Sequence, residues 1–225
     1  MSETLLRAEA LLGAEAMARL RVARILVVGL GAVGGACVEA LARSGVGNLW
    51  LLDGDVFEPS NLNRQPFAAL STLGRTKADA TAERLRDIAP TCSVTAERLR
   101  VDSENVSALL DRARPDAVVD AIDDVPAKLA LLAECLRRGI PAWSAMGAAR
   151  KRDPSALCVT DLSKTQVCPL ARRVRQGLRA LGFTKGIRCV WSREAAAPQI
   201  PGAPLGSLMP VTASAGLLLA ADVIK

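Results

Sequence analysis

Residues 24–65 read RILVVGLGAVGGACVEALARSGVGNLWLLDGDVFEPSNLNRQ and contain the clearest indications of how the chain folds. Ile25–Val28 is an apolar run typical of a buried strand, and Gly29, Gly31 and Gly34 follow at G-x-G-x-x-G spacing before a helical pattern begins. A turn of this kind lets a phosphate approach the backbone, and the amides at the helix N-terminus attract it. The glycines therefore predict a nucleotide site with its phosphates beside them.

A carboxylate follows the next apolar run. Leu49–Leu52 reads as a second buried strand and ends in Asp53, about 20 residues past the glycines, where a carboxylate holds ribose hydroxyls in dinucleotide sites. On this evidence alone NAD is the default ligand. A strand-end cap is the alternative role for Asp53.

The residues beyond this strand favour a polyphosphate over NAD. Ser60–Gln65 reads SNLNRQ, and Lys77 follows in the first turns of a predicted helix. An arginine and a lysine that reach one nucleotide clamp phosphate oxygens and stabilise charge as a phosphoryl bond breaks. A hydride-transfer enzyme needs neither. The alternatives are that Asn61 and Arg64 only shape a loop and that Lys77 is a solvated helix residue.

A third apolar run ends in two carboxylates. Val118–Ile122 delivers Asp123 and Asp124 to the carboxyl end of the predicted sheet, where Asp123 is placed to hold Mg²⁺ on nucleotide phosphates. Asp124 precedes a helix that begins near Pro126. We predict that Asp124 is the N-cap of that helix rather than a metal ligand.

Strand-like runs alternate with helical patterns up to about residue 145, and this alternation predicts a mostly parallel, doubly wound, Rossmann-like α/β sheet. We expect a single domain over residues 1–225, with a nucleotide-binding core at 1–145 and a C-terminal extension for substrate or dimer contacts at 146–225. The predicted strands are Ile25–Val28, Leu49–Leu52, Ser93–Ala96, Val118–Ile122 and Ile140–Ser144, and the predicted helices are Val33–Arg43, Thr76–Ala89, Glu104–Arg112 and Pro126–Arg138.

The C-terminal extension has less regular patterns. We predict a strand at Ala156–Thr160, a helix at Pro169–Leu181, a short extended segment at Arg188–Trp191 and a buried terminal helix at Ala213–Ile224. Ala195–Gly206 is rich in alanine, proline and glycine, and we predict a mobile loop that borders or crosses the functional site.

The composition excludes several kinds of chemistry. The chain has no histidine, which excludes Ser-His-Asp triads, Cys-His dyads and histidine-ligated metals within it, and its six cysteines form no C-x-x-C pair. Proton transfer falls to carboxylates, lysine, water or the substrate, which suits a reaction that makes a good leaving group. The N-terminus lacks a signal-peptide apolar region and no apolar run is long enough to span a membrane, so we expect a cytoplasmic protein.

Together these motifs resemble those of the adenylating family that includes ubiquitin-activating enzymes and the bacterial activators of the molybdopterin and thiamine sulfur carriers. The resemblance runs from Arg7 to Asp124 and includes the glycine turn, a D-x-D motif after the second strand and S-N-L-x-R-Q. It implies adenylation of a carboxylate with ATP and Mg²⁺. The implied ATP-binding residues are Gly29, Gly31, Gly34, Asp53, Asn61, Arg64, Gln65, Lys77 and Asp123. The implied catalytic residues are Arg64, Lys77 and Asp123, with Asp123 also at the metal.

An N-terminal arginine extends this resemblance. Arg7 resembles the arginine that in relatives reaches the ATP of the neighbouring subunit, and it is therefore a further implied ATP-binding residue. This implies a homodimer. The alternative role for Arg7 is the polar face of a short amphipathic helix.

The second half of the chain resembles one branch of that family, the tRNA threonylcarbamoyladenosine dehydratases. The stretches that carry the resemblance are Asp153-Pro154, Asp161–Thr165, Cys168–Arg172 and Leu205–Ser207. That branch uses ATP to cyclise the threonylcarbamoyl group on the adenosine next to the tRNA anticodon. The alternative function is adenylation of the C-terminal glycine of a sulfur-carrier protein, and the lack of paired zinc-binding cysteines counts against it. A non-catalytic nucleotide-binding adaptor and an NAD dehydrogenase are two further candidate functions.

The charge distribution agrees with an RNA partner. The net charge is +6, and in Pro169–Leu181 apolar residues recur at helical spacing, so the arginines of this helix project from its other side. We predict that Arg172, Arg173, Arg175 and Arg179 bind tRNA, and an ordinary solvated helix face is the alternative. A sulfur-transfer protein is a further candidate partner. The basic residues that form this predicted face are Arg150, Lys151, Arg152, Arg172, Arg173, Arg175, Arg179, Lys185 and Arg188.

Overall fold

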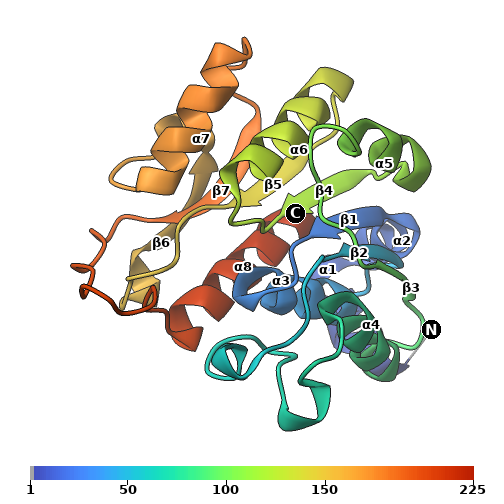
Figure 1. Ribbon diagram of the computed structural model, residues 1–225. Coiled ribbons are helices and arrows are strands. Elements are labelled where there is room, and N and C mark those ends of the chain that lie inside the picture. Colours follow the sequence, from blue (N-terminus) through green and yellow to red (C-terminus); the bar gives the residue numbers. More distant parts are fainter. Residues whose placement is uncertain (1–2) are drawn as a thin grey trace.

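The chain folds around one seven-stranded sheet, which the computed structural model describes together with its helices over residues 3–225 (Figure 1). All neighbouring strands are parallel except the edge strand β6, which runs antiparallel to β7. This confirms the predicted mostly parallel, doubly wound α/β fold. In order across the sheet, the strands are β3 (Ser93–Glu97), β2 (Asn48–Leu52), β1 (Arg24–Val28), β4 (Ala117–Asp120), β5 (Ala142–Ala145), β7 (Ile187–Ser192) and β6 (Leu157–Asp161).

Helices cover both faces of the sheet, because successive side chains of a strand point to opposite faces. In β1, Ile25 and Val27 belong to one hydrophobic cluster and Leu26 and Val28 to the other. Helices α3, α4 and α8 pack on the first face and α5, α6 and α7 on the second (Figure 1). The helices are α1 (Leu6–Leu12), α2 (Ala14–Val22), α3 (Ala32–Arg43), α4 (Lys77–Ile88), α5 (Val106–Ala113), α6 (Val125–Arg138), α7 (Pro169–Ala180) and α8 (Met209–Ile224).

The predicted elements are confirmed, with shifted ends that have local causes. Strand β4 ends at Asp120 instead of continuing to Ile122, because the Ile122 N–H donates to Asp120 Oδ1 at 3.0 Å and turns the chain. Strand β5 starts at Ala142 and not at Ile140, because the Ile140 N–H donates to the Cys135 carbonyl and completes the end of α6. Residues 195–206 form no helix or strand, as predicted.

The C-terminal third of the chain completes the same sheet. Strand β7 pairs with β5, β6 pairs with β7, and α8 packs along α3 beneath them (Figure 1). Residues far apart in sequence thus meet at the carboxyl ends of the parallel strands. None of the helices in residues 3–225 combines the length and apolar character needed to cross a membrane.

Candidate functional site

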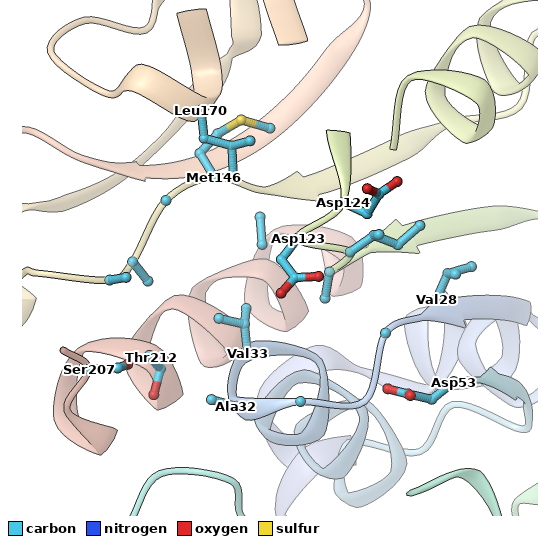
Figure 2. A pocket seen from close by; sticks show the side chains of 18 of the residues that line it. Val28, Ala32, Val33, Asp53, Asp123, Asp124, Met146, Leu170, Ser207 and Thr212 are labelled. Atoms are coloured by element: carbon cyan, nitrogen blue, oxygen red, sulfur yellow. The ribbon is translucent and has the colours of Figure 1, made fainter. Parts of the chain in front are cut away.

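A cavity of about 690 Å³ opens at the carboxyl ends of β1, β2, β4 and β5. Ligands of open α/β sheets bind at this edge, where strand order reverses. In Figure 2, Asp53 lies on one side of Asp123, and Met146 and Leu170 lie on the other side. The cavity therefore has two parts, which we call the glycine-turn half and the Met146 half.

Two of the three glycines of the turn, Gly29 and Gly34, leave no room for a side chain. Gly29 has φ of +92°, and a Cβ there would lie 2.7 Å from the Ala121 carbonyl oxygen. A Cβ on Gly34 would lie 1.8 Å from the Gly29 carbonyl oxygen. Helix α3 begins at Ala32, on the cavity wall, and the N–H groups of a first helical turn have no partner within the helix. This turn therefore fits a phosphate group.

Asp53 lines the cavity and also holds the glycine turn in place. Its Oδ2 accepts a hydrogen bond from the Leu30 N–H at 2.7 Å, and its Oδ1 accepts one from the Asp55 N–H at 2.8 Å. These hydrogen bonds show the structural role at the strand end that was the alternative for Asp53. Its contact with ribose stays a prediction, which its position on the cavity wall allows.

Arg64, Gln65 and Lys77 meet on the cavity wall although they come from two segments. The side chain of Lys77 is 9% exposed and its Nζ lies 3.1 Å from Asp55 Oδ2, so it is not the solvated residue of the alternative interpretation. Arg64 Nη1 donates to the Ser60 carbonyl at 2.7 Å and to Asn63 Oδ1 at 2.9 Å, which fixes its guanidinium. The buried Gln65 Oε1 has no hydrogen-bond partner within residues 3–225, so it can accept from a ligand.

Asn61 and Arg7 do not line the cavity. Asn61 is buried in the turn, where its Oδ1 accepts from the Glu58 N–H and its carbonyl accepts from the N–H groups of Arg64 and Gln65. Asn61 thereby shapes the loop that carries Arg64. Arg7 is exposed on α1. Phosphate contacts by these two residues remain predictions.

The two aspartates after β4 have different surroundings. Asp124 Oδ1 accepts from the Ala127 N–H at 2.9 Å, which confirms that Asp124 caps α6. The exposed Asp123 lines the cavity, and its carboxylate has no hydrogen bond to any described residue. No cluster of three or more potential metal ligands occurs within residues 3–225. One free carboxylate fits Mg²⁺, which is commonly held by one or two carboxylates together with substrate phosphates.

A buried charge network behind the cavity was not predicted. Lys128 Nζ donates to Asp120 Oδ2 at 2.5 Å, to Ser144 Oγ at 3.2 Å and to the Ala145 carbonyl at 3.1 Å. The side chains of Lys128 and Asp120 are fully buried. The network ties the end of β4 to the end of β5. The only sequence signal is Asp120 inside an otherwise apolar run.

Arg100 is a second residue that the sequence analysis missed. It lines the cavity and pairs with Asp55 Oδ1, so Asp55 holds both Arg100 and Lys77. Arg100 lies after β3, and nothing in its local sequence indicates that it reaches the loop after β2. Arg100 therefore joins Arg64 and Lys77 as a cationic side chain on the glycine-turn half.

The Met146 half is built from the C-terminal extension. Its wall follows the loop after β5 from Met146 to Lys151, the first residues of α7, and the predicted loop at 195–206 through Ala196 and Leu205. Arg150 joins these parts, because its N–H donates to the Gly206 carbonyl and its own carbonyl accepts from the Ala197 N–H, both at 2.8 Å. The predicted loop thus borders the cavity, as expected.

The predicted basic face is smaller than the sequence suggests. Arg172, Arg173 and Arg179 are exposed on α7, but Arg175 is half-buried and donates to the Thr165 carbonyl at 3.0 Å. Lys151 is buried, and Arg188 pairs with Asp222 of α8 at 2.8 Å. Burial therefore removes Lys151 from this face, and the charge of the exposed Arg188 is offset by its ion pair. Three arginines of α7 remain free to meet a polyanion.

Cys37, Cys135 and Cys189 are fully buried. All six cysteines are free, and burial raises the pKa of the Cys37, Cys135 and Cys189 thiols to about 12. Such thiols stay protonated near neutral pH and behave as small apolar side chains.

Comparisons with known proteins cover almost the whole chain. The model of the ThiF family matches residues 5–225. The tRNA threonylcarbamoyladenosine dehydratase of Bacillus subtilis strain 168 is 42% identical over 188 residues, which are 84% of this chain and 74% of that protein. The crystal structure of Escherichia coli tRNA N6-threonylcarbamoyladenosine dehydratase with ATP superposes with a TM-score of 0.93 at 38% identity, covering 99% of this chain and 92% of that one. The same enzyme with AMP gives a TM-score of 0.92 at 38% identity, covering 97% and 91%.

Proposed function

Since this chain belongs to the ThiF family, we propose that it uses ATP to dehydrate, by cyclisation, the threonylcarbamoyladenosine next to a tRNA anticodon. One observation carries the proposal. A single cavity joins a glycine turn that fits nucleotide phosphates to a second half with room for the acceptor, the substrate whose carboxylate is adenylated. The relatives at 42% and 38% identity bear the name of this activity. We place the reaction in the cytoplasm, as the sequence predicts.

The proposed reaction has two steps. The carboxylate of the threonyl group attacks the α-phosphate of ATP, and pyrophosphate leaves. A nucleophile within the modified base then attacks the acyl carbon, closes the ring and displaces AMP. One water is lost from the nucleoside, and its oxygen leaves in AMP. No histidine is needed, because adenylation makes the leaving group good.

In this proposal the glycine-turn half binds ATP. The amides at the start of α3 and the side chains of Arg64 and Lys77 bind phosphate oxygens, and they stabilise the charge that grows on pyrophosphate as it leaves. Asp53 contacts the ribose, and Gln65 Oε1 accepts from the nucleotide or from ordered water. Asp123 holds Mg²⁺, which when bound would neutralise phosphate charge.

The proposal includes a dimer. Arg7 is exposed on α1 and lies outside the cavity wall, so it is free to reach the nucleotide of a second subunit. Leu11 and Val22 on α1 and α2 are 84% and 72% exposed. Apolar side chains at this end suit an interface between subunits.

Adenylation of a sulfur-carrier protein is the alternative function. It would use the same ATP site, and only the acceptor would differ. The separate cysteines count against it, because no described group of residues can hold the zinc expected from paired cysteines. A sulfur-transfer protein is a further proposed partner.

Mass spectrometry of digested tRNA tests the proposed function. The purified protein is incubated with Mg-ATP and tRNA that carries threonylcarbamoyladenosine, and we expect that nucleoside to lose the mass of one water in an ATP-dependent way. AMP and pyrophosphate should form in equal amounts. An unchanged nucleoside with folded protein would contradict the proposal, and ATP–pyrophosphate exchange that depends on a carrier protein would then favour the alternative.

The α7 arginines provide a separate prediction about RNA binding. Changing Arg172, Arg173 and Arg179 to glutamine should raise the Kd for tRNA and reduce the slope of log Kd against log salt by about 2–3, since each phosphate that a cation neutralises adds about 0.7–0.9 to that slope. Salt titrations followed by filter binding measure this slope. Arg19→Gln, on an exposed ion pair of α2, is the matched control. An unchanged slope in the triple variant would show that α7 does not contact the RNA backbone.

A further inference from the structure

Three lysines are buried within residues 3–225, and one of them has no carboxylate partner. Lys77 pairs with Asp55, and Lys128 pairs with Asp120. Lys151 is 3% exposed, and its Nζ has a single hydrogen bond, to the Glu194 carbonyl oxygen. An ammonium group has three N–H donors, so two donors of Lys151 lack an acceptor in the described structure.

Glu194 does not serve as the missing counter-ion. Its two carboxylate oxygens accept from the N–H groups of Arg152 and Asp153 at 3.0–3.1 Å. No ion pair within 4 Å joins Lys151 to any described carboxylate. A buried charge without a partner is strongly unfavourable, and such groups in a cavity mark sites for an oppositely charged ligand.

Lys151 lies on the wall of the Met146 half of the cavity. Its neighbours on that wall include Met146 and Leu170, whose apolar side chains face the cavity on the opposite side of Asp123 from Asp53 (Figure 2). The phosphate-binding groups Arg64 and Lys77 belong to the ATP end in the proposed function. The Met146 half offers apolar surface for a nucleoside base and two cations, Arg150 and Lys151, of which only Lys151 is buried.

We propose that Lys151 binds the carboxylate that is to be adenylated, and that this contact selects an acidic nucleoside as acceptor. The inference rests on the proposed function and deepens it by assigning the acceptor end of the cavity. Arg150 next to it has φ of +58° and donates through Nη1 to the Ala197 carbonyl at 3.1 Å, so the loop at 195–206 is attached to the same segment. Phosphate oxygens of ATP are the other source of the same charge, and the experiment separates the two.

Binding of free nucleosides tests the contact. Isothermal titration of the wild-type protein should show that threonylcarbamoyladenosine binds about tenfold to a hundredfold more tightly than its neutral methyl ester, the range expected for hydrogen bonds to a charged group. Lys151→Met should bind both nucleosides with equal affinity and bind ATP within about twofold of wild type. Lys151→Arg should keep part of the preference.

Thermal unfolding separates ligand binding by Lys151 from a structural role, because loss of a structural role would lower the Tm of Lys151→Met. Lys151→Met removes an uncompensated charge, so its Tm should equal or exceed that of wild type. Lys128→Met leaves the buried carboxylate of Asp120 without a cation and should lower the Tm. Lys151→Met with a Tm as low as that of Lys128→Met would overturn the inference. So would a retained preference for the acid, a loss confined to ATP affinity, or no nucleoside binding by wild type. Inactivity of wild type on tRNA with the preference intact would overturn only the proposed function.

Discussion

Replacing Lys128 by methionine is expected to lower the free energy of unfolding by about 3–5 kcal/mol. The change leaves the carboxylate of Asp120 fully buried without a cation, and it removes the donor to Ser144 Oγ and to the Ala145 carbonyl. Because β4 and β5 end at this network, the substitution affects the cavity wall as well as the core. Urea unfolding followed by circular dichroism measures the free energy.

Two further variants show whether charge causes this effect. The double variant Asp120→Asn with Lys128→Met should recover much of the lost stability, because no unpaired charge remains and the amide oxygen can still accept from the Ile122 N–H. Arg19→Met removes a pair whose side chains are 67% and 92% exposed, and it should cost less than about 1 kcal/mol. If Lys128→Met and Arg19→Met lowered the free energy of unfolding equally, the cost of Lys128→Met could not be attributed to the buried charge of Asp120.

Replacing Arg64 by alanine is expected to reduce kcat/KM for ATP-dependent dehydration by about 10²–10³, the cost typical of one preorganised charge-stabilising donor. Arg64 lines the glycine-turn half, and two hydrogen bonds to Ser60 and Asn63 hold its guanidinium in position. The Tm should change little, since the side chain is only half-buried. The assay is the rate of water loss from the nucleoside under Mg-ATP, by mass spectrometry.

Two further substitutions test the prediction for Arg64, one at Arg64 itself and one at a distant arginine. Arg64→Lys keeps a charge but loses the planar pair of donors, so it should recover only part of the rate. Arg84→Ala, on the exposed side of α4 in a pair with Asp87, should leave the rate unchanged. A rate for Arg64→Ala within about threefold of wild type would contradict the phosphate role.

The sheet was predictable because its strands are short apolar runs that end in polar residues. Such runs are recognisable locally, and right-handed βαβ connections then give a parallel sheet. The end of β4 and the start of β5 were misplaced by two residues each, because side-chain and capping hydrogen bonds fixed them. Both bonds join residues that are close in sequence, but a pattern of apolar runs does not reveal such turns.

The glycine-turn half of the site was also predictable in outline. Seven of the predicted nucleotide-site residues lie on the cavity wall, namely Gly29, Gly31, Asp53, Arg64, Gln65, Lys77 and Asp123. The predicted cap role of Asp124 depends on the first turn of one helix and needs no tertiary contact. Roles that depend only on neighbouring residues can be predicted from the sequence.

The class of fold, the nucleotide turn and the resemblance to an adenylating family could be recognised from the residues alone, because each depends on short spacing along the chain. Which cations are free depends on the folded structure. Lys151 is buried without a carboxylate partner, Lys128 is buried in a pair with Asp120, and Arg188 stays exposed but is paired with Asp222. The physical reason is that the free energy of a charge depends on its surroundings in three dimensions, and residues from distant segments supply those surroundings.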